Sequence, residues 1–275
     1  MRTLVHLSDL HFGRVDDALL QPLTDLILQL APDLLVVSGD LTQRARSREF
    51  IAARAFLESL PFPRIVVPGN HDISLHNLFD RFLRPLAKYR RHITNDLQPF
   101  FFDNEIAVVG VNTARSLTIK DGRINHEQMA QVSARFAGVA KSLVKIIVTH
   151  HPFDLPDQYR STELVGQADS ALQSFASIGA DLLLAGHLHA SHAGTTDARY
   201  PIDGYAALVV QAGTATSTRG RGEANSFNVL RIDFAEIVSE RYAWQASSNQ
   251  FKLFSSKKFV RSGERWTVHG GGDSR

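Results

Sequence analysis

Short apolar runs rich in β-branched residues alternate along this chain with segments of helical periodicity, and this alternation constrains the fold most. The runs are typical of strands buried on both faces, and they occupy residues 3–7, 34–37, 64–67, 106–111, 144–149 and 181–185. Between them, a 3.6-residue apolar spacing predicts helices over residues 18–30, 47–60, 125–141 and 167–178. Ser47 is a candidate N-cap, and Asn125 with Gln128 has capping-box spacing. The pattern predicts an α/β fold with helices covering the sheet faces.

The pattern changes after about residue 190. Residues 205–211, 226–233, 237–244 and 251–260 indicate successive strands with Gly-rich turns between them. We expect these strands to form a second, mostly antiparallel sheet packed on the first. Residues 1–275 are therefore predicted to form a single domain. Within it, residues 1–190 form the core that carries the site, and residues 191–275 supply mainly second-sheet strands and a tail.

Composition restricts the metal chemistry, the partners and the location. The chain has no cysteine, so a metal site must use nitrogen and oxygen ligands. Its 30 Lys and Arg residues nearly balance 28 Asp and Glu residues, so no nucleic acid polymer is expected as a partner. The start of the chain lacks a signal-peptide pattern, and no run of about 18 apolar residues occurs. We therefore expect a cytoplasmic protein.

Five polar clusters stand out, and four of them directly follow a predicted strand. They are Asp9-Leu10-His11, Gly39-Asp40, Gly69-Asn70-His71-Asp72, His150-His151-Pro152 and Gly186-His187-Leu188-His189. Ligands of α/β sheets bind beyond the carboxyl ends of the strands, so these clusters should converge. In an extended segment residues i and i+2 face the same side, which predicts that each Asp-x-His or His-x-His pair holds one site together. The glycines are expected to let the backbone turn sharply.

Each cluster alone has an ordinary explanation, because an Asp-x-His or Gly-Asp pair is common in surface turns. The combination is harder to explain structurally. Buried polar groups are costly unless they are paired or metal-bound, and a packed domain does not need them at five strand ends. The set therefore indicates a metal centre.

In their order along the chain, these clusters resemble the signature of the calcineurin-like metallophosphoesterases. That signature runs D-x-H, G-D, G-N-H-[DE], H-x-P and G-H-x-H, and every block is present between residues 9 and 189. The resemblance implies a four-layer α/β/β/α sandwich of two mixed sheets. It also implies two divalent transition-metal ions, and mixed imidazole, carboxylate and amide ligands suit Mn, Fe or Zn.

The resemblance also implies a role for each residue of the motifs. It divides the metal ligands into two groups bridged by Asp40: Asp9, His11 and His189 for one ion, and Asn70, His150 and His187 for the other. The expected nucleophile is a hydroxide that bridges the ions, because metal coordination lowers the pKa of water. His71 would stabilise phosphoryl charge or protonate the leaving oxygen, and Asp72 would orient His71. The role of His151 stays open, and His192 is the first other histidine to examine.

Departures from the family's branches narrow the predicted activity. Residues 39–44 (GDLTQR) lack the G-D-x-V-D-R-G run of protein Ser/Thr phosphatases, and Asp72 stands where those enzymes have Glu. His71 stands where lipid-A precursor hydrolases usually have Arg. The sequence is most similar to bacterial class III cyclic-nucleotide and glycerophosphodiester phosphodiesterases. We predict a metal-dependent phosphodiesterase acting on cyclic nucleotides or similar small phosphodiesters.

Three segments leave alternatives open. Residues 76–91 and 251–266 mix aromatic and basic side chains. The first is either an amphipathic element with a solvated basic face or a lid on an anionic substrate or lipid surface. The second is either a cationic edge strand or a membrane anchor. The alternative function is thus a peripheral, phospholipase C-like head-group phosphodiesterase, and a third hypothesis is a metal-binding protein without activity. Residues 214–221 either bring Arg219 and Arg221 to a phosphate or form a plain turn.

Overall fold

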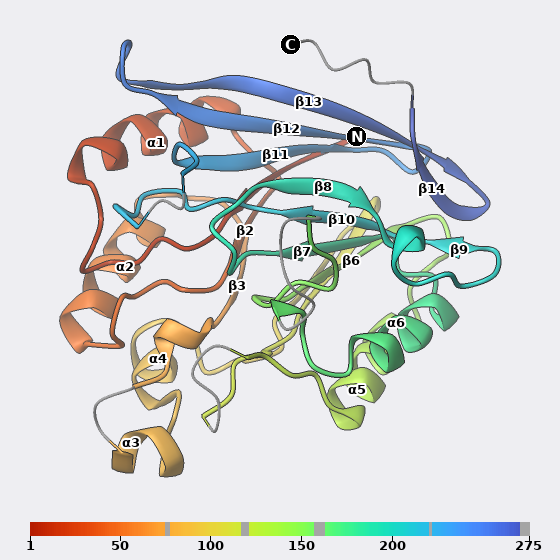
Figure 1. Cartoon of the computed structure of the whole chain (residues 1–275), viewed down its shortest axis with the longest axis horizontal. Helices are drawn as coiled ribbons and strands as arrows, with labels where there is room; N and C mark the ends of the chain where they lie inside the picture. The colour runs from red at the N-terminus through yellow and green to blue at the C-terminus, as the bar shows by residue number, and fades with distance from the viewer. Residues whose placement is uncertain (75–77, 117–120, 157–162, 220–221, 270–275) are drawn as a thin grey trace.

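The computed structural model describes residues 1–74, 78–116, 121–156, 163–219 and 222–269 (Figure 1). The six strands predicted in the first 190 residues are confirmed: β1 (Arg2–Leu7), β2 (Leu34–Ser38), β3 (Arg64–Val67), β5 (Ile106–Gly110), β6 (Val144–Val148) and β7 (Leu182–Ala185). The four helices predicted between them are also present: α1 (Asp17–Leu30), α2 (Ser47–Glu58), α5 (His126–Phe136) and α6 (Ala168–Ser177). Strands β2, β5 and β6 are buried along their whole length, as their apolar runs predict.

The strands form two mixed sheets. The first contains β3, β2, β1, β11 (Ser226–Ile232), β12 (Glu236–Gln245), β13 (Gln250–Ser262), β14 (Glu264–Val268) and β9 (Tyr205–Ala206), in that order. The second contains β4 (Phe100–Phe102), β5, β6, β7, β10 (Leu208–Gln211) and β8 (His192–Thr195). Strands β1 to β3 are parallel to one another, and so are β5, β6, β7 and β10.

The prediction that the strands after residue 190 form a sheet of their own is wrong. Strand β11 pairs antiparallel with β1, from Arg2 opposite Ile232 to His6 opposite Asn228. Strand β10 instead extends the other sheet by pairing parallel with β7. The periodicity of a strand reports which of its faces are buried but not which strand lies beside it. The local pattern therefore could not predict that β11 joins one sheet and β10 the other.

Alternate residues of the central strands point into different cores, which produces the layers. Val36 of β2 and Val108 of β5 pack together between the two sheets. Val37 faces the opposite way, into a core that includes residues of α1 and α2. Val109 likewise faces a core that includes residues of α5 and α6. Helices therefore cover both outer faces, and the predicted four-layer α/β/β/α sandwich is confirmed (Figure 1).

The two predicted helix caps have different outcomes. At α5 the capping box is confirmed, because Gln128 N donates to Asn125 Oδ1 at 2.8 Å and Asn125 N donates to Gln128 Oε1 at 3.1 Å. At α2, Ser47 is the first helical residue and not the cap. The longer side chain of Glu49 reaches back instead, and its carboxylate accepts from the N–H of Arg44 at 2.8 Å.

Short helices occupy most of the first aromatic and basic segment: η1 (Asn70–Asp72) precedes it, and α3 (Leu78–Leu83) and α4 (Ala87–His92) lie within it. Tyr89 is fully buried and its hydroxyl donates to the carbonyl of Val66 at 2.9 Å, so α4 is an amphipathic helix packed on the core. Phe82 and Leu83 of α3 are 52% and 66% exposed. Their contact with a substrate or lipid stays a prediction, and residues 76 and 77 lie outside the described ranges.

The second aromatic and basic segment belongs to the long strands β13 and β14. Strand β13 pairs with β14 only from Phe259 to Ser262, and Leu253 and Phe254 on its earlier part are exposed. Trp266 is buried at the other end, where its Nε1 donates to Asp181 Oδ1 at 3.1 Å.

The short 3-10 turn η3 (Thr196–Ala198) follows β8. In the part of the chain that the structure describes, the helices are too short or too polar to cross a membrane.

Candidate metal centre

All five polar clusters follow strands of the two parallel sets. Three come after β1, β2 and β3 of the first sheet, and two come after β6 and β7 of the second. The loops at these strand ends are hydrogen-bonded to one another, with Asp9 N donating to Gly39 O at 3.1 Å and His11 N donating to Asp40 O at 2.9 Å. The prediction that the clusters converge is thus met by loops from both sheets.

One group of side chains gathers Asp9, His11 and His189. Their ligand atoms all lie within 4.8 Å of one another. The Nε2 atoms of His11 and His189 are 3.1 Å apart, and they lie 3.6 and 3.2 Å from Asp9 Oδ1. All three side chains are buried. Two imidazole nitrogens and a carboxylate oxygen pointing at one place are suited to a transition-metal ion.

A second group forms around Asn70. Its Oδ1 atom lies 3.0 Å from His150 Nε2 and 3.2 Å from His187 Nδ1. These residues come from the loops after β3, β6 and β7, so both sheets contribute to the group. The amide oxygen and the two imidazole nitrogens match the ligand types expected of a second ion.

Asp40 lies between the two groups. Its Oδ2 atom is 3.7 Å from Nε2 of His11 in the first group, and its Oδ1 atom is 3.4 Å from Nε2 of His150 in the second. The carboxylate is buried, and Oδ1 also accepts from the N–H of His71 at 2.8 Å. One carboxylate therefore faces both groups with different oxygens.

The backbone brings these side chains together in a way that the sequence argument did not anticipate. Asp9, His11, His187 and His189 have positive φ angles of 53°, 51°, 74° and 57°. The paired residues therefore lie in left-handed conformations and not in extended strand, so the i, i+2 argument is wrong. A left-handed residue turns the chain abruptly, which lets both side chains of a pair reach inward from one tight loop.

At two of the flanking glycines, the absence of a side chain lets neighbouring loops approach closely, and this matters more than the freedom of the backbone to turn. A Cβ atom on Gly69 would lie 2.1 Å from Asp40 Oδ1, and one on Gly186 would lie 1.8 Å from Ser8 Oγ. Gly39 has a φ of +95° and fits the predicted sharp turn, and a Cβ atom there would also lie 2.6 Å from His150 Nδ1. The loops thus pack against the carboxylates so tightly that no side chain fits between them.

Backbone carbonyls orient three of the imidazole rings. Nδ1 of His150 faces Ser38 O at 2.8 Å, and Nδ1 of His189 faces Arg219 O at 3.0 Å. His11 Nδ1 has a longer contact of 3.4 Å with Thr42 O. Because a carbonyl only accepts, each Nδ1 carries a hydrogen, which leaves Nε2 as the ring atom that faces the centre, as a metal-ligating histidine requires.

The electrostatics of the cluster favour a cation. Burial opposes ionisation of Asp40 and Asp9, yet His150 and His189 respectively hold the pKa of these carboxyls well below the usual range. Burial also opposes charging of His150, but Asp40 raises its pKa to about 9. For His11, burial prevails and lowers the pKa. Asp9 Oδ1 is buried and accepts no hydrogen bond from the described residues, and such an oxygen fits a metal ion.

His71 adjoins the cluster through Asp40 and contacts an arginine that the sequence indicated only weakly. Its Nδ1 faces the carbonyl of Gln43 at 2.8 Å, and its Nε2 lies 3.0 Å from a guanidinium nitrogen of Arg219. Arg219 comes from the loop after β10, 148 residues further along the chain. The signal in the sequence was an arginine in a Gly-rich loop. Arg221 of that loop lies outside the described residues.

The prediction that Asp72 orients the ring of His71 differs from the structure. The Asp72 carboxylate accepts from the backbone N–H groups of Leu41, Thr42 and Gly69 at 3.2, 2.9 and 2.9 Å. The ring of His71 is held instead by the backbone carbonyl of Gln43, which lies 2.8 Å from Nδ1. Burial, with a smaller contribution from Asp40, raises the pKa of Asp72 to about 6. Asp72 therefore acts on the loops that carry Asp40 and His71.

The histidines without a motif role have distinct surroundings. His151 is buried, its Nδ1 lies 2.8 Å from Thr113 Oγ1, and its ring centroid is 4.6 Å from that of His187. His192 lies away from this group, with Nε2 3.7 Å from Asp154 Oδ2. His6 is buried beneath the centre in β1, where burial lowers its pKa to about 3. Of these three, His151 is the one whose ring packs against predicted ligands, His150 and His187.

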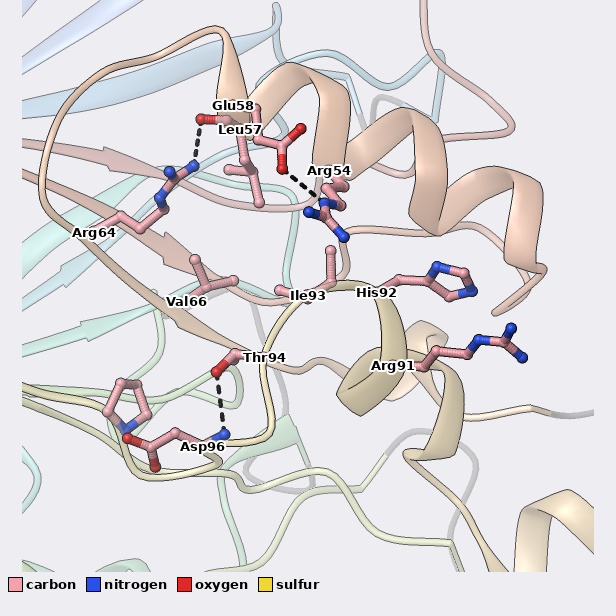
Figure 2. Close-up of a pocket in the computed structure, with 11 residues that line it drawn as sticks. Arg54, Leu57, Glu58, Arg64, Val66, Arg91, His92, Ile93, Thr94 and Asp96 are labelled. Carbon is pink, nitrogen blue, oxygen red and sulfur yellow. Dashed lines mark hydrogen bonds and ion pairs between the residues drawn. The ribbon is translucent and has the colours of Figure 1, made fainter.

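A pocket of about 370 Å³ lies apart from the centre, between the end of α2, β3 and the residues after α4 (Figure 2). Arginines line it, but two of them already have partners. Arg54 Nε lies 2.7 Å from Glu58 Oε1, and Arg64 donates to the carbonyl of Leu57. The pocket is lined by none of the predicted metal ligands.

The fold and this set of strand-end ligands define a known class. A family profile described as calcineurin-like phosphoesterase matches residues 2–191, and the chain belongs to that family. A glycerophosphodiester phosphodiesterase, GpdQ of Enterobacter lignolyticus, is 36% identical over 95 residues, which cover 30% of this chain and 34% of that protein. A probable cyclic nucleotide phosphodiesterase of Ruthia magnifica subsp. Calyptogena magnifica is 27% identical over 134 residues, covering 42% and 56%. The chain thus spans about a third and just over half of these relatives.

Solved structures share the fold at lower identity. A purple acid phosphatase, PPD1, from yellow lupin (Lupinus luteus) has a TM-score of 0.72 at 14% identity, covering 94% of this chain and 54% of that one. A dimetal phosphatase from Danio rerio has a TM-score of 0.67 at 13% identity, covering 95% and 99%. These likenesses extend the shared fold over nearly the whole chain.

Proposed function

We propose that this protein is a two-metal phosphodiester hydrolase that acts on cyclic nucleotides or similar small phosphodiesters. The observation that carries the proposal is the position of Asp40 between the two groups of candidate ligands, with Oδ2 3.7 Å from His11 Nε2 and Oδ1 3.4 Å from His150 Nε2. Two neighbouring cations repel each other, and a shared carboxylate reduces that repulsion. A single-ion site would have no need of a second set of nitrogen and oxygen ligands.

The residues that would hold the ions are those of the two groups, with Asp40 shared: Asp9, His11 and His189 for one ion, and Asn70, His150 and His187 for the other. When bound, such ions supply Lewis acidity, which polarises a phosphoryl oxygen and lowers the pKa of water. The left-handed loops and the carbonyls behind the imidazoles hold the ligands in place before substrate arrives, which reduces the reorganisation needed during the reaction.

His71 is the residue of this site best placed to assist the leaving group. Its backbone N–H is bonded to Asp40, and Gln43 fixes Nδ1, so Nε2 is the ring atom directed away from these two anchors. In the proposed reaction Nε2 takes up a proton from solvent when substrate binds, and His71 then stabilises charge on the phosphoryl group or protonates the departing oxygen. Asp72 supports it indirectly: its carboxylate accepts from the backbone N–H of Thr42 at 2.9 Å, and Thr42 Oγ1 donates to the carbonyl of His71 at 3.1 Å.

A metal-supplemented substrate screen tests the proposed activity. Purified protein reconstituted with Mn, Fe or Zn should hydrolyse bis(p-nitrophenyl) phosphate faster than p-nitrophenyl phosphate. It should also act on cAMP or a glycerophosphodiester. Equal or faster turnover of the monoester would contradict the diester assignment. No turnover of any of these compounds with any of the three metals would support a binding protein without activity.

Exposed apolar side chains favour one second candidate, a peripheral phospholipid head-group phosphodiesterase. Phe82 and Leu83 on α3, and Leu253 and Phe254 on β13, are between 51% and 66% exposed. Exposed apolar residues beside basic ones suit an anionic lipid surface. Faster hydrolysis of phospholipid in liposomes than of small soluble diesters would support this function and contradict the first.

A further inference from the structure

Arg219 contacts the centre through both its main chain and its side chain. Its carbonyl accepts from Nδ1 of His189, a candidate metal ligand, at 3.0 Å. Its own N–H donates to Ser217 Oγ at 3.1 Å, and one guanidinium nitrogen lies 3.0 Å from Nε2 of His71. The main chain of Arg219 is therefore anchored beside one ligand, while its side chain extends to the residue placed at the leaving group.

The direction of the contact with His71 follows from the partners of the ring. The carbonyl of Gln43 can only accept, so the nearby Nδ1 of His71 carries the hydrogen. Nε2 then has a lone pair, which accepts from the guanidinium of Arg219. The arginine is thus held at the ring edge by an imidazole nitrogen and not by a carboxylate.

Most of the donor capacity of Arg219 is left for another molecule. A guanidinium has five N–H donors, and among the described residues its only hydrogen bond is the one to His71. The side chain is half-buried, and within the same ranges no Asp or Glu lies within 4.0 Å of it. The nearby Glu223 is paired instead with Arg241 at 2.7 Å.

We propose that Arg219 binds a non-bridging oxygen of the substrate's phosphoryl group, and that His71 holds the guanidinium in position until substrate arrives. A planar, permanently charged fork of N–H donors fits phosphoryl oxygens closely. The inference rests on the proposed hydrolase function and assigns that site a substrate-binding residue outside the metal ligands. It predicts a preference for substrates whose phosphoryl oxygens are anionic and unsubstituted.

The main-chain contact makes the proposal testable without disturbing the ligands. Any substitution of Arg219 keeps the carbonyl that accepts from His189, so the metal content should not change. The variants are Arg219→Ala and Arg219→Lys, and Arg91→Ala is the matched control. Arg91 lines the separate pocket of Figure 2, and none of the predicted ligands lines that pocket.

The experiment measures binding of inorganic phosphate to the Mn-loaded proteins by calorimetry, together with KM and kcat for bis(p-nitrophenyl) phosphate. Loss of a charged hydrogen bond should weaken phosphate binding and raise KM by about 10- to 100-fold in Arg219→Ala. Arg219→Lys should lose less, because it keeps the charge but not the fork. Arg91→Ala should stay within about twofold of wild type.

Four results would overturn the inference. Phosphate affinity and KM within about twofold of wild type in Arg219→Ala, with only kcat reduced, would make Arg219 a positioning residue for His71. Loss of metal from both variants would make its side chain a support for the ligands. A wild-type protein that neither binds phosphate nor hydrolyses the diester would overturn the proposed function as well, whereas an active wild type with an unchanged Arg219→Ala overturns this inference alone.

Discussion

Five of the seven predicted metal ligands, Asp9, His11, Asp40, His187 and His189, have left-handed backbone conformations, with φ between 51° and 74°. Such conformations cost a non-glycine residue about 1–3 kcal/mol each, and they cluster at functional sites. Glycine would relieve the strain at every one of these positions. These positions therefore carry Asp and His because of the oxygen and nitrogen atoms that the side chains direct at the centre, and not because they stabilise the loops.

Replacement of Asp40 tests the bridging role. We expect Asp40→Ala to abolish turnover, because it removes the one carboxylate that faces both ligand groups and leaves two cations uncompensated. Activity on bis(p-nitrophenyl) phosphate would be compared with that of Asp25→Ala, an exposed aspartate on α1. Activity of Asp40→Ala within about tenfold of wild type, or about 1.4 kcal/mol in the barrier, would contradict the role.

Replacement of His71 separates leaving-group assistance from metal binding. His71→Ala should keep both metals and lose about 10²–10⁴-fold in rate on substrates with an alkoxide leaving group. The loss should be smaller with p-nitrophenolate, which needs no proton. Rates on cAMP and bis(p-nitrophenyl) phosphate would be measured beside metal content. Lost metal would make His71 a ligand, and an equal loss on both substrates would favour charge stabilisation over proton donation.

The side chains that lie together at the centre could be predicted from the sequence because each motif is short and follows a strand. Their conformations could not, since left-handed φ angles of Asp and His depend on the surrounding loops that enforce them. The contact between Arg219 and His71 could not be predicted from the sequence either. It joins residues 148 positions apart through a loop whose path depends on β10 and β11 lying in different sheets.

At the scale of elements, the loop after β6 is tied to β8 and to the residues that follow it by one buried carboxylate. Asp154 Oδ1 accepts from Arg199 Nε at 2.7 Å, and Oδ2 lies 3.7 Å from Nε2 of His192. Burial opposes ionisation of Asp154, but these two partners lower its pKa. A carboxylate with a lowered pKa stabilises the fold above its unfolded pKa of about 4. That stabilisation is lost as the pH falls through the folded pKa.

Asp154→Asn should therefore reduce the free energy of unfolding at pH 7 by about 1.5–3 kcal/mol, the range for hydrogen bonds to charged groups. The difference from wild type should shrink as the pH falls below about 4. Denaturant unfolding at neutral and acidic pH measures both values, with the exposed Asp203→Asn as control. A difference independent of pH would show that the carboxylate acts by packing and not by charge.

Strand and helix positions could be read from periodicity, but strand partners could not. Strands β2 and β5 have the same fully buried pattern, yet they lie in different sheets. Both sheets recruit strands from the last third of the chain: β9 and β11 to β14 for one, and β8 and β10 for the other. Such pairings join distant segments, and the local sequence holds no signal for which of two apolar edges a strand will meet.

For the whole molecule, the packing of the two sheets has a direct consequence for the centre. Strands β1 to β3 supply Asp9, His11, Asp40 and Asn70, and strands β6 and β7 supply the loops with the remaining histidines. Each proposed ion is held by residues from both sheets. The proposed metal centre would therefore join the two halves of the sandwich, and metal binding should stabilise the fold as a whole.

Metal content measures the central claim, a two-metal centre, most directly. The protein would be stripped with chelator, reconstituted with Mn, freed of loose metal and subjected to elemental analysis beside Asp40→Ala. Wild type should hold two ions per chain, because the seven side chains form two groups that share Asp40. Asp40→Ala should hold fewer, since the cations lose their shared carboxylate. One ion or fewer per wild-type chain would contradict the account.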